Sequence, residues 1–217
     1  MKTTFLLIVA AAAAIVAAAL LFPGSAPEGE PAPARPGSGV ADTLEAATFA
    51  GGCFWCVEEA FDAVDGVVST TSGFTGGHVE DPSYEEVSSG GTGHAEAVRV
   101  TYASDRVTYR ELLDVFWHNV DPTDAGGQFC DRGSQYRSAI FVHDAGQRRI
   151  AEASKERLER TKPFEEPIVT PIEEAGPFWP AERYHQDYHE KRPIRYKVYK
   201  FGCGRERRLV ELWGESR

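Results

Sequence analysis

Cysteine is scarce in this chain, and an excess of positive charge is absent. Only 4 of the 217 residues are cysteine, while 42% are hydrophobic and 26% are charged. A chain of this length and composition buries a core without needing a scaffold of disulfides. The formal net charge is -10 at pH 7, whereas a protein that binds nucleic acid needs a cationic surface. The two shortages therefore exclude a disulfide-scaffold protein and argue against nucleic acid as a partner.

Internal repeats are also absent, and basic residues gather late in the chain, in KRPIRYKVYK and GRERR. A solvated protein face explains such a cluster most simply. A docking patch for an acidic partner is the alternative interpretation.

The first 22 residues form a separate segment, predicted to be a signal or membrane anchor. Residues 5–22 carry no charge and almost nothing polar, a run just long enough to cross a bilayer. The small residues at 24–26 are typical of a cleavage site, but Pro27 follows them, so an uncleaved anchor is preferred. No cysteine stands near the end of the run, which argues against a lipoprotein. The lone Lys2 favours a cytoplasmic N-terminus, and the rest of the chain is expected to be extracytoplasmic (periplasmic), anchored or secreted.

Residues 23–45 are predicted to be a linker, because their first part is rich in Pro, Gly and Ala and holds almost no large apolar side chain. Such a segment cannot bury enough surface to order itself. The length of the chain is that of one domain, which we place at residues 46–217. Membrane contact is expected only through the N-terminal segment.

Hydrophobic periodicity predicts both strands and helices in this domain. Predicted strands cover residues 47–50, 67–74, 97–102, 136–143 and 168–172. A helix is expected to start at Cys53 and end at Gly66, another to follow the capping box Thr108-x-x-Glu111, and two more to cover 147–160 and 182–190, before an irregular tail. Long loops are expected at 76–94 and 121–135. Because strands and helices do not alternate strictly, the fold class is α+β with a mixed β-sheet flanked by helices.

The stretch GGCFWCVEE, residues 51–59, places two of the four cysteines one helical turn apart. A strand leads into the double glycine, and the helix begins at Cys53, where unpaired N–H groups and a partial positive charge are found. A thiol at such a position loses its proton more easily, and the thiolate is the nucleophile. The pattern therefore favours a reactive Cys53, with a buried structural cysteine as the alternative.

Two other chemistries compete for these cysteines. A zinc site would need scattered ligands, since Cys130 and Cys203 stand alone, so no metal is predicted. A thioredoxin-like thiol–disulfide oxidoreductase would use Cys53 and Cys56, and the IVTPI stretch resembles the proline-led strand of that fold. That stretch lies too far downstream for so compact a fold. His185 and His189 have metal-ligand spacing but no third ligand, and are interpreted as packing or surface residues.

Five segments in order, GCFWCVE, TGHAEAVRV, DPTDAGGQ, DRGSQYRSAIF and ERYHQDY, resemble the peptide methionine sulfoxide reductase A family from about residue 47 to residue 213. The resemblance implies a ferredoxin-like α/β sandwich of a single domain. The protein is expected to be a monomer. It implies an enzyme that reduces the S-epimer of methionine sulfoxide, free or in proteins. No bound cofactor is implied, because electrons come from a thioredoxin-type or dithiol reductant outside the enzyme; repair of oxidised methionine is the corresponding role.

The resemblance also assigns roles to residues. Cys53 is implied as the nucleophile that becomes a sulfenic acid, and Glu96 as the acid that protonates the departing oxygen, helped by burial that would raise its pKa. Tyr84 and Tyr136 match the family's two site tyrosines, which can bond the sulfoxide oxygen. Asp131 matches a site aspartate.

Three further residues are candidates for binding the substrate. Phe54 and Trp55 would form the apolar wall that receives the methyl group, although they could also be ordinary core aromatics. His94 precedes the acid and is a candidate that could instead shape its loop.

A second thiol must then condense with the sulfenic acid. Many family members carry glycine where this chain has Cys56, and hold their resolving cysteines in a C-terminal tail. Cys56 is the preferred resolving residue, because a cysteine one turn into the helix can reach the first. Cys203, in the tail stretch FGCGR, is the second candidate. Cys130 and a relay from Cys56 to Cys203 stay open.

Two other functions remain as competing hypotheses. A thioredoxin-like oxidoreductase would reduce insulin disulfides without turning over sulfoxide. A non-catalytic, membrane-tethered binding domain would hold no hyper-reactive thiol.

Overall fold

The computed structural model describes residues 43–214. The predicted anchor at 1–22 and almost all of the predicted linker at 23–45 lie outside the described residues. The first strand starts at Leu44, so regular structure begins two residues before the predicted domain start. Among residues 43–214, no helix is both long enough and apolar enough to span a bilayer.

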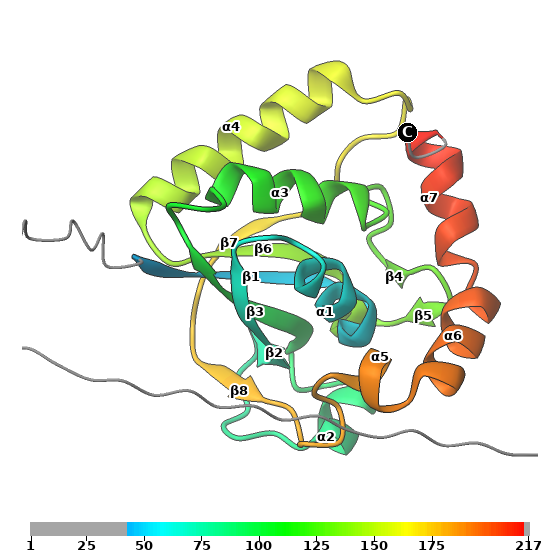
Figure 1. The fold of residues 1–217 in the computed structure, drawn as a ribbon. Coiled ribbons are helices and arrows are strands. Elements are labelled where there is room, and N and C mark those ends of the chain that lie inside the picture. The colour runs from blue at the N-terminus through cyan, green and yellow to red at the C-terminus, as the bar shows by residue number, and fades with distance from the viewer. Residues whose placement is uncertain (1–42, 215–217) are drawn as a thin grey trace, which may run out of the picture. The chain divides into compact units, whose positions relative to one another are not determined.

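A six-stranded sheet forms the centre of the molecule, with strand order β7-β6-β1-β3-β2-β8 (Figure 1). Its strands are β1 (Leu44–Gly51), β2 (Val67–Thr75), β3 (Ala95–Ala103), β6 (Ser138–Val142), β7 (Ile172–Glu174) and β8 (Phe178–Pro180). Neighbours pair antiparallel except β6 and β7, which are parallel. The mixed sheet of the predicted α+β class is therefore confirmed. A second, two-stranded sheet pairs β4 (Gly127–Gln128) with β5 (Asp131–Arg132).

Helices flank this sheet. They are α1 (Phe54–Asp62), α2 (Tyr84–Ser88), α3 (Tyr109–His118), α4 (Ala145–Thr161), α5 (Tyr188–Lys191), α6 (Pro193–Gly202) and α7 (Arg205–Trp213), with a 3-10 turn at Ser134–Tyr136. The last three follow one another along one side of the molecule, beside β4 and β5 (Figure 1).

Aromatic packing between β1 and the helices forms the core. The Phe49 ring stacks on Phe61 of α1 at 4.8 Å and on Phe116 of α3 at 5.3 Å, measured between ring centroids. The predicted capping box starts α3, because the Thr108 side chain accepts from the backbone of Glu111 and the Glu111 side chain accepts in return. Trp117 donates its indole N–H to Ser154 at 3.0 Å and so joins α3 to α4.

The C-terminal prediction was wrong in two respects. The segment after residue 190, expected to be irregular, forms α6 and α7, and the helix expected at 182–190 is reduced to α5. Helix α6 opens with Pro193 at its first position and buries Tyr196, yet exposes Ile194 and Val198 on its other side. Apolar residues on both faces hide the one-sided periodicity on which the prediction relied.

Other boundaries differ less. The strand expected at 168–172 begins only at Ile172, and the loops expected at 76–94 and 121–135 contain α2 and the β4–β5 pair. Strands β2 and β3 and helix α4 lie where they were predicted, and Asp144 caps α4 by accepting from the N–H groups of Gly146 and Gln147.

Strand β8 can pair closely with β2 only because residue 73 is glycine. A Cβ on Gly73 would lie 2.4 Å from the Trp179 carbonyl oxygen and 2.6 Å from the Phe178 ring. We expect Gly73→Ala to lower the free energy of unfolding by about 1–3 kcal/mol, as overpacking typically does. Urea denaturation would measure it. Gly176→Ala is the control, since nothing lies within 4 Å of a Cβ there; equal stability of the two variants would contradict this account of the β2–β8 pairing.

Candidate active site

The turn between β1 and α1 places Cys53 at the first corner of the helix. Gly52 has φ +81°, and a Cβ there would lie 2.5 Å from the Gln128 side chain, so only glycine fits. Cys53 is the N-cap residue of α1, one residue before the helix proper, as the sequence predicted. The residue is 6% exposed, so its thiol is reached only through a cavity.

That cavity has a volume of about 230 Å³ and is called the catalytic cavity below. It brings together seven residues that the sequence singled out and one that it did not. They are Cys53, Phe54, Trp55, Tyr84, Glu96, Asp131 and Tyr136, with Tyr199 as the addition.

Glu96 is a buried carboxyl beside the reactive thiol. Its Oε2 accepts the N–H of Phe54 at 3.1 Å, which satisfies one of the unpaired donors at the start of α1. Burial raises the pKa of Glu96 to about 8, and the charges of Asp131 and Cys56 add to the rise, while the Phe54 N–H opposes it. The group therefore keeps its proton at neutral pH and can donate it.

Two tyrosine side chains that interact with each other line the cavity together with this acid. Tyr84 opens α2, where its backbone N–H donates to Glu182 at 2.9 Å, and Tyr136 ends the 3-10 turn. Burial raises the pKa of Tyr84 to about 12, with the Glu96 charge as the next cause. Both phenols are therefore neutral and able to donate hydrogen bonds.

Tyr199 of α6 was missed by the sequence interpretation. Its hydroxyl donates to the Asp131 carboxylate and also bonds the Cys53 thiol. Burial raises the pKa of Asp131, although Tyr199 and Arg205 oppose the rise. The Tyr196-x-x-Tyr199 spacing after Pro193 was the available signal, but it is visible only once the tail is known to be helical.

The pKa values of the two thiols shift in opposite directions. Burial raises the pKa of Cys53 well above its ordinary value. The hydrogen bond from Cys53 lowers the pKa of Cys56 to about 6 against the opposing effect of burial, and Arg205, Tyr196 and Lys200 lower it further. The helix start was expected to ionise Cys53; burial opposes that ionisation, whereas the cationic and hydrogen-bonding groups around Cys56 favour a negative charge on its sulfur.

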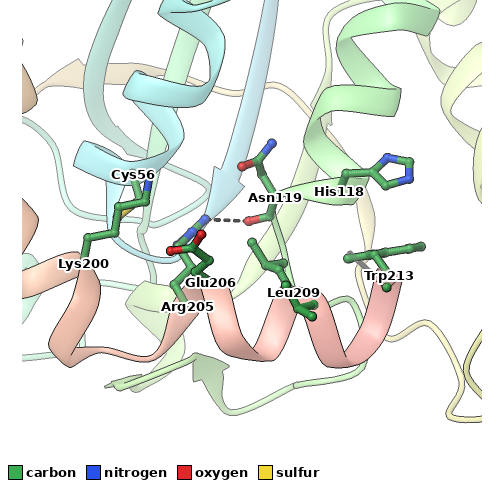
Figure 2. Close-up of a pocket in the computed structure, with 10 residues that line it drawn as sticks. Cys56, His118, Asn119, Lys200, Arg205, Glu206, Leu209 and Trp213 are labelled. Carbon is green, nitrogen blue, oxygen red and sulfur yellow. Dashed lines mark hydrogen bonds between the residues drawn. The ribbon is translucent and has the colours of Figure 1, made fainter. Parts of the chain in front are cut away.

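A second, wider cavity of about 810 Å³ reaches Cys56 from the side of α7 (Figure 2). Its lining is Cys56, His118, Asn119, Lys200, Arg205, Glu206, Leu209, Val210, Trp213 and Gly214. Arg205 is 3% exposed and donates to the carbonyl oxygens of Gly51 at 3.2 Å and Asn119 at 2.6 Å. This buried cation stabilises negative charge on the Cys56 sulfur.

The remaining cysteines form a disulfide, which the sequence did not predict. Cys130 and Cys203 are bonded to each other, so Cys203, the second candidate for the resolving residue, is not a free thiol in this structure. Its Sγ lies 3.9 Å from the Asp131 carboxylate. Both sulfurs and that carboxylate are close enough to hold a metal ion, but the disulfide engages the two sulfurs.

His94 does not line the catalytic cavity, contrary to its prediction as a substrate-binding residue. Its Nδ1 accepts the N–H of Gly77 at 3.1 Å and its Nε2 donates to the Val79 carbonyl at 2.7 Å. Both ring nitrogens are thus engaged in holding the loop that follows β2, the alternative that the sequence left open.

The indole of Trp55 is fixed on two sides. Its N–H donates to His185 Nδ1 at 3.1 Å, and its ring stacks on Tyr188 at 3.8 Å. His185 is 2% exposed, and burial lowers its pKa to about 4, so the ring is a neutral acceptor. It is a packing residue, as predicted, and it sets the orientation of Trp55. His189 lies next to Tyr188 in α5, with its ring nitrogen 3.6 Å from Asp62.

Known proteins resemble the chain over nearly all of its described length. The family described as peptide methionine sulfoxide reductase matches residues 45–217. A Bacillus licheniformis protein named peptide methionine sulfoxide reductase MsrA is 54% identical over 177 residues, covering 82% of this chain and 98% of that protein. The structure of Mxr1 from Saccharomyces cerevisiae in reduced form is 34% identical, with a TM-score of 0.65 and coverage of 69% of this chain and 86% of that one. Methionine sulfoxide reductase A of Corynebacterium diphtheriae is 33% identical, with a TM-score of 0.61 and coverage of 70% and 76%.

The opposite pKa shifts of Cys53 and Cys56 predict how the thiol pair titrates. With the Cys130–Cys203 disulfide intact, Cys53 and Cys56 are the thiols that titrate, and we expect one thiolate to appear with a midpoint of about 6, measured by ultraviolet thiolate absorbance. Arg205→Met should raise that midpoint, because it removes a nearby positive charge. Arg207→Met is the control, since its side chain is 82% exposed. Persistence of the low midpoint in Cys56→Ser would assign the thiolate to Cys53 and contradict the assignment.

Proposed function

This chain belongs to the peptide methionine sulfoxide reductase family, and we propose that it reduces the S-epimer of methionine sulfoxide, free or in proteins, through a sulfenic acid on Cys53. The observation that carries the proposal is the catalytic cavity, where a thiol faces a protonated carboxyl and two neutral phenols. Sulfoxide reduction needs a nucleophile for sulfur and a proton for oxygen, and this cavity offers both.

The first step starts with the proton of Cys53. That proton moves to the neighbouring Cys56 thiolate as the Cys53 sulfur attacks the sulfoxide sulfur, so that no free Cys53 thiolate forms beforehand. Glu96 and the two phenols donate to the sulfoxide oxygen as charge develops on it. The oxygen passes to Cys53, which becomes a sulfenic acid, and the substrate leaves as a thioether.

The methyl group of the substrate is placed by the aromatic residues of α1. Phe54 and Trp55 line the cavity, and Trp55 is held by His185 and Tyr188. An apolar wall beside a polar donor group distinguishes the two ends of a methyl sulfoxide. This arrangement supports the proposed preference for the S-epimer, which family membership suggests.

Resolution of the sulfenic acid is assigned to Cys56. Its sulfur attacks Cys53, the sulfenic oxygen leaves as water with the thiol proton, and a Cys53–Cys56 disulfide forms. Cys203 is less suited to this step, because its sulfur is already bonded to Cys130. It could take part only by thiol–disulfide exchange.

An external thioredoxin-type dithiol is proposed to return the pair to thiols, so no bound cofactor takes part. The wide cavity beside Cys56, with Lys200 and Arg205 in its lining, gives an attacking thiolate a path and a favourable charge. We also propose that residues 1–22 carry a monomeric catalytic domain out of the cytoplasm on the spacer at 23–45.

Replacement of each cysteine separates the two stages. Cys53→Ser should abolish sulfoxide reduction, because the nucleophile is lost. Cys56→Ser should allow one turnover per enzyme and then require dithiothreitol, since no neighbouring thiol closes the disulfide. Methionine formed in single-turnover and in thioredoxin-driven assays would be measured by chromatography.

The same assays can contradict the scheme. Steady thioredoxin-driven cycling by Cys56→Ser would move resolution to another cysteine. Reduction of insulin disulfides by the wild type, without any methionine formed, would replace the proposed function with a thiol–disulfide oxidoreductase.

The raised pKa of Glu96 predicts the pH dependence. Its protonated form is the active one, so kcat/KM should fall as the pH rises through about 8. Glu96→Gln should lower kcat/KM about 100-fold and remove this limb of the pH profile, because general acids contribute at least that much. Glu80→Gln, at an exposed carboxylate, is the control. An unchanged limb in Glu96→Gln would assign the proton to another group.

A further inference from the structure

Helix α6 exposes three large apolar side chains in a row. Ile194 is 79% exposed, Val198 is 69% exposed and Phe201 is 88% exposed, while Tyr196 on the opposite side is 1% exposed. Their spacing of four and three residues puts them on one face of a helix. A continuous apolar face on an otherwise charged surface is typical of a binding site.

A groove lies between this face and the catalytic residues. It has a volume of about 370 Å³ and is lined by Trp55, Tyr188, Ile194, Arg195, Val198 and Tyr199; we call it the α6 groove. Trp55 and Tyr199 also line the catalytic cavity, so the two hollows share a wall. A ligand seated at Cys53 would need to extend only past the side chains of Trp55 and Tyr199 to reach the α6 groove.

From this continuity we propose that the α6 groove binds an apolar side chain of a polypeptide substrate, close in sequence to its oxidised methionine. The inference rests on the proposed reduction of methionine sulfoxide in proteins. An extended chain advances about 3.5 Å per residue, so a residue about two positions from the sulfoxide reaches past one indole ring. Free methionine sulfoxide has no such residue and leaves the groove unused.

Charge on the rim of the groove adds a second preference. Arg195 lines the groove, and Arg192 and Lys197 are its near neighbours in sequence. All three are exposed and make no ion pair within the described part of the chain, whereas the whole chain carries a net charge of -10. An acidic residue in the substrate is thus attracted to this rim and repelled by much of the remaining surface. The favoured substrate segment combines an apolar residue with an acidic one.

The shared wall also decides between possible occupants. A membrane surface or a second copy of the chain would cover the apolar face without needing to be continuous with the cavity at Cys53. The reductant acts on the thiol pair after the substrate has left. Only the substrate polypeptide must occupy both hollows at once.

The test compares two peptides and free methionine sulfoxide, with dithiothreitol as the reductant. One peptide carries leucine two positions from the oxidised methionine and the other carries serine. For each peptide, kcat/KM is divided by kcat/KM on free methionine sulfoxide. With the wild type, this ratio should be about tenfold higher for the leucine peptide than for the serine peptide. In Val198→Ser the two peptides should become nearly equal.

Val68→Ser is the matched control, because Val68 is a 55% exposed valine of β2 that lines neither hollow, and it should keep the wild-type preference. Equal kcat/KM for the two peptides with the wild type, or an unaltered preference in Val198→Ser, would overturn the proposal. An effect of Val198→Ser that occurs only when a thioredoxin-type protein replaces dithiothreitol would also overturn it, by making the groove a reductant site. A wild type inactive on all three substrates would instead overturn the proposed function.

Discussion

The hydrogen bond from the Phe54 N–H to the Glu96 carboxyl is the contact on which the site depends. It joins the first residue of α1 to β3 and so sets the spacing between the Cys53 sulfur and the acid. Burial acts in the same direction on the two groups: it keeps Glu96 protonated, which the reaction needs, and it makes ionisation of Cys53 costly. The thiolate therefore needs a second location, which the cationic surroundings of Cys56 provide.

Helix α6 completes the site from outside the sheet. Tyr199 bonds Asp131 and Cys53, Tyr196 bonds Glu59 next to Cys56, and Lys200 bonds the same glutamate. One short helix thus supplies hydroxyl groups to both sulfurs. Its outer face carries Ile194 and Val198, which line the α6 groove together with Trp55 of α1 and Tyr188 of α5, so α6 contributes both to the thiol environment and to the groove.

The sequence predicted the parts of the site that local patterns encode. The helix start at Cys53, the strand that carries Glu96 and the capping box of α3 follow from spacing, and the family motifs brought Tyr84 and Tyr136 to the same cavity. Tyr199 and Arg205 could not be found this way, because α6 is apolar on both faces and the partners of a buried arginine lie far away in sequence. The location of the resting thiolate also depends on burial, which no local pattern measures.

The Cys130–Cys203 disulfide has a consequence for α6. It closes a loop with a sequence separation of 73 residues, and a crosslink of that span removes chain entropy from the unfolded state worth roughly 4 kcal/mol. The carboxyl end of α6 is thereby fastened to the turn that carries Asp131, and a ten-residue helix that would be marginal alone is kept from fraying. A reductant that opened this crosslink would loosen α6, which borders the proposed substrate groove, so the strength of the electron donor and the integrity of that surface are tied together.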